Sequence, residues 1–133
     1  MSNSETFFTK IAQSYTFDGK TILIGGGIED SSQTIPCPVY IPLKTLNRHG
    51  LIAGATGTGK TKSLQLLAES LSDAGVPVLM MDIKGDLSGI AKEGMINKHI
   101  EKRKDIIGMQ WNGKGYPVEL MSISSEAGVR LRA

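Results

Sequence analysis

The sequence has one cysteine, few aromatic residues and no long apolar run, and each shortage excludes a class of protein. Cys37 is the only cysteine among 133 residues, which excludes an internal disulfide and a cysteine-based zinc site. The longest apolar runs, residues 21–28 and 76–83, are far shorter than the roughly 20 residues of a membrane-spanning helix. Residues 1–10 lack the apolar core of a signal peptide. We therefore expect a cytoplasmic protein with no membrane partner and a partly buried, unreactive Cys37.

The composition is that of one modest globular domain. Hydrophobic residues make up 40% and charged residues 21% of the chain, which is enough apolar material for a packed core. Aromatic residues are only 5% while glycines number 16, a balance that favours a loop-rich α/β protein over an all-β sandwich. The net charge of +2 neither favours nor excludes a nucleic-acid partner.

Residues 1–47 are expected to form a small β-rich lead-in. Residues 5–13 have the spacing of a short amphipathic helix, and residues 21–24 and 39–41 are typical of strands. The three glycines at 25–27 could suggest a phosphate-binding loop. No lysine or helix former follows them, so a flexible turn is the better interpretation.

Residues 48–133 are expected to form the second region, which opens with a strand–helix–strand unit. Residues 49–53 and 78–81 are apolar enough for buried parallel strands. A helix is predicted from Lys60 to about Ala74, with Gly75 as its left-handed stop. The apolar face of this helix comprises Leu64, Leu67, Ala68, Leu71 and Ala74, and the polar face includes Lys62, Glu69 and Asp73. Together these elements predict a right-handed βαβ unit.

The loop inside this unit matches the pattern G-x-x-x-x-G-K-[ST] at every fixed position. Glycines allow successive backbone N–H groups to face one anion, and the following helix N-terminus adds positive potential. Lys60 supplies a full charge to the β- and γ-phosphates, and the Thr61 hydroxyl can bind Mg²⁺. The pattern predicts ATP and Mg²⁺ as ligands and Lys60 as a catalytic residue. The predicted nucleotide-binding residues are Gly54, Ala55, Thr56, Gly57, Thr58, Gly59, Lys60, Thr61 and Lys62.

Asp82 follows the second apolar run and is a candidate catalytic and Mg²⁺-binding residue. The alternative interpretation is that it forms the turn after the strand. Residues 82–85 also fit the D-x-x-G pattern of GTPases, but the 22 positions from Lys60 to Asp82 leave no room for a switch loop and another strand. Ile100 stands where the guanine-reading N-K-x-D pattern requires aspartate, so we expect ATP rather than GTP.

Beyond Asp82 the pattern is weaker. Residues 98–105 are rich in charge and predict the solvated face of a helix, with DNA contact as the alternative. Residues 116–123 and 129–132 are typical of strands, joined by a turn at 124–128.

Residues 48–61 and 78–88 together resemble the HerA/FtsK superfamily of ATPases, and most of all the bacterial helicase HerA-like C-terminal domain family. A weaker resemblance extends over residues 116–133. The resemblance to this superfamily implies a P-loop NTPase fold with a RecA-like parallel sheet and flanking helices. It also implies a homo-oligomer that is hexameric in many relatives, and ATP hydrolysis often used to move DNA or protein. DNA is therefore a possible partner by resemblance alone.

The resemblance also places Lys84 and Asp86, with Asp82, near the γ-phosphate, although solvated loop charges are the favoured interpretation of Lys84 and Asp86. His49 is expected to be packed or capping, and His99 exposed.

The family's later strand ending in Asp-Glu has no counterpart after Ile83, since neither Glu119 nor Glu126 follows such a strand. Arg130 and Arg132 cannot be assigned as an arginine finger. We therefore expect an N-terminal piece of a longer ATPase that is inactive alone. The alternatives are a non-catalytic nucleotide-binding or assembly module and a small phosphotransferase.

Overall fold

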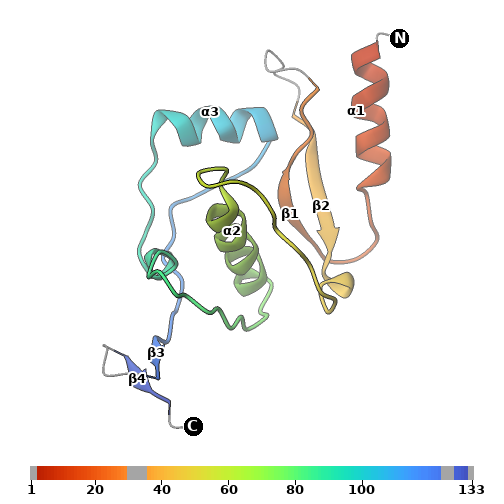
Figure 1. Cartoon of the computed structure of the whole chain (residues 1–133). Coiled ribbons are helices and arrows are strands. Elements are labelled where there is room, and N and C mark those ends of the chain that lie inside the picture. The colour runs from red at the N-terminus through yellow and green to blue at the C-terminus, as the bar shows by residue number, and fades with distance from the viewer. Residues whose placement is uncertain (1–2, 30–35, 124–127, 132–133) are drawn as a thin grey trace.

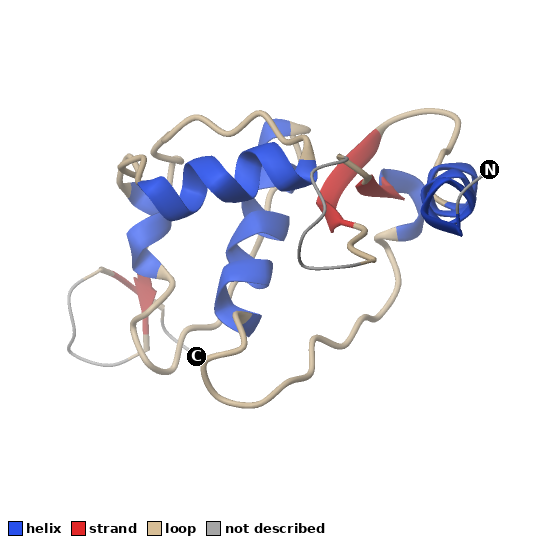
Figure 2. Cartoon of the chain, turned by 90° about the horizontal axis from the view of Figure 1, so that it is seen from above, coloured by secondary structure: helices blue, strands red, loops and turns tan. Residues whose placement is uncertain are grey.

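A computed structural model describes residues 3–29, 36–123 and 128–131. In it, two short antiparallel strands lie between helices on either side. Helix α1 (Asn3–Ser14) lies beside β2 (Pro38–Pro42), whereas α2 (Lys60–Asp73) and α3 (Lys98–Ile107) lie beside β1 (Thr21–Gly26) on the other side (Figures 1 and 2). The short elements are η1 (Leu43–Thr45), η2 (Ser88–Ala91), β3 (Met121–Ser122) and β4 (Val129–Arg130). The helix expected at residues 5–13 and both strands expected before residue 47 are confirmed.

The β1–β2 hairpin carries part of the small apolar core. Its register runs from Thr21 opposite Pro42 to Gly26 opposite Pro38, with an irregularity between Leu23 and Gly25. Ile22 of β1 is buried at 5% exposure. Cys37, a free thiol just before β2, is buried at 4% exposure, more completely than the partly buried thiol expected from the sequence.

Two of the three glycines at 25–27 belong to this sheet and the third is hydrogen-bonded across it, so the prediction of a flexible turn was wrong. Gly25 and Gly26 belong to β1, and the Gly27 N–H donates to the Cys37 carbonyl at 2.7 Å. A Cβ on Gly26 would lie 3.2 Å from the Cα of Ile107, at the end of α3. Gly26 therefore allows α3 to approach the strand closely, a non-local contact that the local sequence does not reveal.

Helix α2 forms as predicted, but its predicted apolar face is only partly buried. Gln65 and Ala68 are its buried residues, whereas Leu64 on the predicted apolar face is 41% exposed. The prediction supposed that this face packs against a parallel sheet. In the structure α2 contacts β1 instead. The helix ends as expected, with Gly75 in the left-handed region at φ 81°.

The parallel strands expected before and after α2 in the sequence are absent from the described residues. Residues 49–53 and 78–81 are not strands, and Leu51, Leu79 and Met81 are 88%, 84% and 88% exposed. A strand is stabilised by hydrogen bonds to a neighbouring strand, and these two runs have none in the described part of the chain. The protein is thus α/β with short sheets, and the predicted RecA-like sheet is not formed here.

The C-terminal strands are shorter than predicted. Only Met121–Ser122 and Val129–Arg130 pair, and they do so in parallel. The Tyr116 N–H instead donates to the Ile90 carbonyl at 3.1 Å, which ties the start of this segment to η2. Residues 124–127, which include Glu126 and most of the predicted turn, lie outside the described residues, as does Arg132.

Candidate functional site

The loop of residues 54–59 leads directly into the first turn of α2 and is closed on the carbonyl oxygen of Ala55. That oxygen accepts hydrogen bonds from the Thr58 hydroxyl at 2.8 Å and from Lys60 Nζ at 2.7 Å. The Thr58 N–H also points to it, at 3.4 Å. The Lys60 side chain therefore folds back across the loop, and the loop with Lys60 and Thr61 is named the 54–61 loop below.

Glycines make this closed shape possible. Gly57 and Gly59 have φ of 80° and 93°, in the left-handed region where a side chain is disfavoured. A Cβ on Gly54 would lie 2.6 Å from the Thr58 hydroxyl, so a larger residue there would displace the Thr58–Ala55 hydrogen bond. The spacing of glycines in the pattern thus has a direct structural reason in this loop.

The beginning of α2 is open to an anion. Gly59 precedes the helix, and no side chain caps its first N–H groups. Its first turn carries no acidic residue, while Lys60 and Lys62 add positive charge. Residues 54–59 are exposed. Unpaired N–H groups and the helix dipole make such an end favourable for a phosphate.

Asp86 is the acidic residue that the structure brings to this loop. Its Oδ2 atom lies 3.5 Å from the Thr61 hydroxyl oxygen. Its backbone carbonyl accepts a hydrogen bond from Gln65 Nε2 at 3.2 Å, and Gln65 Oε1 accepts one from Lys62 Nζ at 2.9 Å. Sequence reasoning treated Asp86 mainly as a loop charge. The contact between residues 25 positions apart fits instead the position near the γ-phosphate that the family resemblance implied.

Asp82 precedes Asp86 in the segment after α2, and its carboxylate is hydrogen-bonded to the backbone of the residues that follow it. Its carboxylate accepts N–H hydrogen bonds from Lys84 at 3.2 Å, Gly85 at 2.9 Å and Leu87 at 2.8 Å. These bonds, that from Leu87 foremost, hold the pKa of Asp82 below its ordinary value because they favour the charged form. They fit the turn-forming interpretation of Asp82, while its role toward a metal stays a prediction.

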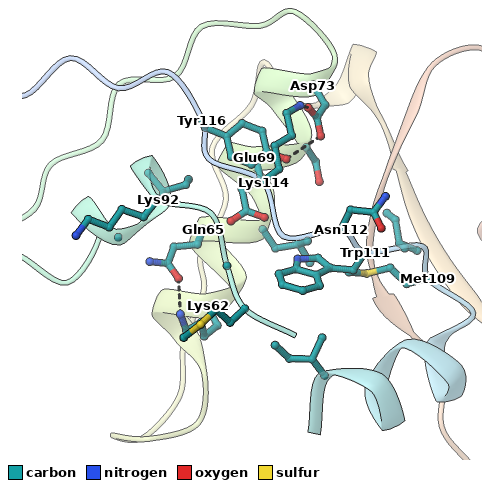
Figure 3. A pocket seen from close by; sticks show the side chains of 18 of the residues that line it. Lys62, Gln65, Glu69, Asp73, Lys92, Met109, Trp111, Asn112, Lys114 and Tyr116 are labelled. Atoms are coloured by element: carbon teal, nitrogen blue, oxygen red, sulfur yellow. Dashed lines mark hydrogen bonds and ion pairs between the residues drawn. The ribbon is translucent and has the colours of Figure 1, made fainter. Parts of the chain in front are cut away.

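A cavity of about 540 Å³ opens next to these residues, between α2 and the segments around η2 and Trp111 (Figure 3). Lys62 and Asp86 line it, so it adjoins the 54–61 loop. Glu69 also lines it, and burial raises the pKa of this carboxyl above its ordinary value. Sequence reasoning placed Glu69 only on the polar face of the helix.

Asp73 closes the far end of this cavity together with two residues that no local pattern singles out. It forms an ion pair with Lys114 and accepts a hydrogen bond from the Tyr116 hydroxyl at 2.8 Å (Figure 3). The hydrogen bond from Lys114 is the main cause of the lowered pKa of Asp73. Burial, followed by the bond to Asp73, raises the pKa of Tyr116 to about 12. This cluster ties the segment before β3 to the end of α2.

The remaining candidates are exposed side chains outside the 54–61 loop. His49, expected to be packed or capping, is exposed, so that prediction was wrong, whereas His99 is exposed as predicted. The basic stretch forms α3, where Lys98, Lys102 and Arg103 are exposed.

Across residues 3–29, 36–123 and 128–131, no group of three or more histidine, cysteine or acidic side chains is placed to hold a metal ion. In the same ranges no helix has the length and apolar character needed to cross a membrane.

Comparison with known families assigns most of the chain. Residues 28–133 match the family model described as helicase HerA-like C-terminal, and this match includes the 54–61 loop, α2 and Asp86. Searches among curated proteins and among solved structures found no match. Because the family model covers more than half of the sequence, the chain belongs to the helicase HerA-like C-terminal family.

Proposed function

We propose that the 54–61 loop binds the phosphates of ATP together with Mg²⁺, and that the chain belongs to a P-loop ATPase. The observation that carries this proposal is the loop closed on the Ala55 carbonyl, followed at once by an α2 N-terminus without a side-chain cap. Family membership supports the same activity, since the matched model is that of a helicase domain.

The residues of the loop fit a triphosphate with its metal. Lys60 Nζ makes one hydrogen bond, to a neutral carbonyl, and can exchange it for a phosphate oxygen with little movement of the backbone. The Thr61 hydroxyl is at the loop's edge, where an oxygen ligand for Mg²⁺ is required. Bound Mg²⁺ supplies charge neutralisation between the β- and γ-phosphates.

The protein's part in hydrolysis is to position and to stabilise charge. Backbone N–H groups in the first turn of α2 and the Lys60 ammonium offer positive potential to the oxygens that gain charge in the transition state. Thr61 orients the metal side of the nucleotide. We further infer, from the family, a homo-oligomeric assembly. The hexamer and a DNA partner rest on resemblance alone.

Replacing Lys60 tests the proposal. We expect Lys60→Ala to keep the fold, because the side chain bonds only within an exposed loop, and to weaken binding of a fluorescent ATP analogue. Loss of a charge-assisted hydrogen bond costs about 1.5–3 kcal/mol, which corresponds to a roughly 10- to 150-fold higher Kd. The matched control is Lys44→Ala, which removes an exposed lysine in η1. Equal affinities in wild type and Lys60→Ala would contradict the assignment of this loop.

A further inference from the structure

Residues 82–87 form a loop, named the 82–87 loop, whose shape is set by the Asp82 carboxylate. Three backbone N–H groups donate to it, two to Oδ1 and that of Leu87 to Oδ2. Gly85 takes a left-handed φ of 75° within the turn, and the Leu87 side chain is buried at 7% exposure. Both carboxylate oxygens of Asp82 are therefore used to hold its own loop in place.

Gln65 joins the 82–87 loop to α2. It is buried at 8% exposure, so its amide needs partners on both ends. Its Nε2 donates to the Asp86 carbonyl at 3.2 Å, and its Oε1 accepts from Lys62 Nζ at 2.9 Å. The backbone of Asp86 is thereby held against the first turns of the helix that begins with Lys60 and Thr61.

The position of the Asp86 carboxylate follows from this docking. Its Oδ2 lies 3.5 Å from the Thr61 hydroxyl oxygen, at the outer limit of a hydrogen bond, and both side chains are exposed or half-buried. Two oxygens in adjacent positions around one Mg²⁺ are about 3 Å apart, given Mg–O distances near 2.1 Å. The pair is thus close to the spacing at which two oxygens share a cation, directly or through its water.

We propose that Asp86, positioned by Gln65, is the carboxylate that faces the Mg²⁺ of bound ATP beside Thr61, and that Asp82 shapes the loop that carries Asp86. This inference rests on the proposed function of the 54–61 loop. It differs from the sequence-based hypothesis, in which Asp82 itself contacts the metal. The Asp82 carboxylate already accepts three backbone N–H hydrogen bonds, whereas among the described residues the Asp86 carboxylate accepts only the long hydrogen bond from Thr61.

The test compares ATP-analogue affinity in excess Mg²⁺ with affinity in EDTA, so that its readout is binding rather than turnover. Wild type should bind more tightly with Mg²⁺. We expect Asp86→Asn to reduce this Mg²⁺-dependent gain about tenfold. In EDTA the same variant should bind as well as wild type or better, because a negative charge beside the phosphates is gone. Asp86→Glu should recover part of the gain, and Asp105→Asn, an exposed aspartate of α3, should leave it unchanged.

The role of Gln65 is tested in the same assay. Gln65→Met keeps the side-chain volume but loses both hydrogen bonds, and we expect a smaller Mg²⁺-dependent gain with EDTA affinity retained. A merely structural role would lower both affinities equally. The proposal is overturned if Asp82→Asn removes the gain while Asp86→Asn retains it. Failure of the wild-type chain to bind the analogue in either buffer would instead overturn the proposed function itself, and this inference with it.

Discussion

Glu69 shows how a single carboxylate can weaken the fold around a candidate site. Burial beside the cavity raises its pKa, an effect only partly offset by the nearby Lys62 charge. The folded chain therefore holds the proton more tightly than the unfolded chain does. As the pH rises above 4.5, the ordinary value, the unfolded state loses its proton first and unfolding becomes easier.

We accordingly expect Glu69→Gln to stabilise the protein at pH 7. The gain should be on the order of 0.5 kcal/mol, because water still screens a side chain that is only partly buried. Urea unfolding followed by circular dichroism at pH 7 and at pH 4 measures the difference. The gain should shrink at pH 4, where the wild-type carboxyl is mostly protonated in both states. A variant that is less stable than wild type at pH 7 would show that attraction to the Lys62 charge outweighs burial.

At the scale of elements, α2 and α3 begin in opposite ways. The Asn97 side chain caps α3 by accepting N–H hydrogen bonds from His99 and Ile100, both at 3.0 Å. Helix α2 follows Gly59, which has no side chain to offer, so its first N–H groups remain available to a ligand. The difference separates a helix end built for stability from one suited to anion binding.

This contrast predicts the effect of removing the cap on α3. Asn97→Ala should cost about 0.5–2 kcal/mol of the free energy of unfolding, because two N–H groups lose their acceptor. Asn97→Asp should recover that loss, since its carboxylate can cap and also favours the helix dipole. Denaturant unfolding of wild type, Asn97→Ala and Asn97→Asp measures the loss and its recovery. ATP-analogue affinity should stay constant throughout, and a parallel loss of affinity would mean that α3 supports the 54–61 loop.

At the scale of the whole molecule, the apolar residues of the missing strands lie at the surface. Leu51, Leu79, Met81 and Ile83 are 84–97% exposed, and they belong to the segments that enter and leave the α2 region. Exposed apolar groups of this extent are typical of surfaces that associate. The 133-residue chain is therefore expected to self-associate as its concentration rises.

Sedimentation velocity over a range of concentrations tests this expectation. Placing lysines at two exposed positions, with the double variant Leu79→Lys and Met81→Lys, should shift the chain toward the monomer. Gln13→Lys adds a charge at an exposed site of α1 and should change little. A wild-type chain that remains monomeric at every concentration would contradict the prediction.

ATP hydrolysis also depends on the whole molecule. Positioning phosphates and metal supplies only part of the catalysis, and no apolar strand ending in Asp-Glu follows Ile83 to orient water. An arginine finger alone contributes about 10³- to 10⁵-fold in related enzymes. We expect phosphate release from the 133-residue chain at saturating Mg·ATP to match that of Lys60→Ala. Turnover of about 1 s⁻¹, an ordinary enzymatic rate, that disappears in Lys60→Ala would show that the catalytic set is complete in this chain.

Sequence alone determined the features that depend on near neighbours in the chain. The 54–61 loop closes and α2 begins at Lys60 because Gly57 and Gly59 can take a positive φ and Gly54 leaves room for the Thr58 side chain. Gly75 ends α2 for the same local reason, as predicted. The loop motif also carried the family resemblance, which the family match over residues 28–133 confirms.

Tertiary structure alone decided what depends on residues far apart. Strand pairing is non-local, so the apolar run at 78–81 predicted a strand that finds no partner among the described residues. The buried face of α2 and the close approach of Gly26 to Ile107 likewise follow from the position of β1. Asp82 and Asp86 are both aspartates of one loop in the sequence. The buried Gln65 amide holds the second beside Thr61, while three backbone N–H groups occupy the first.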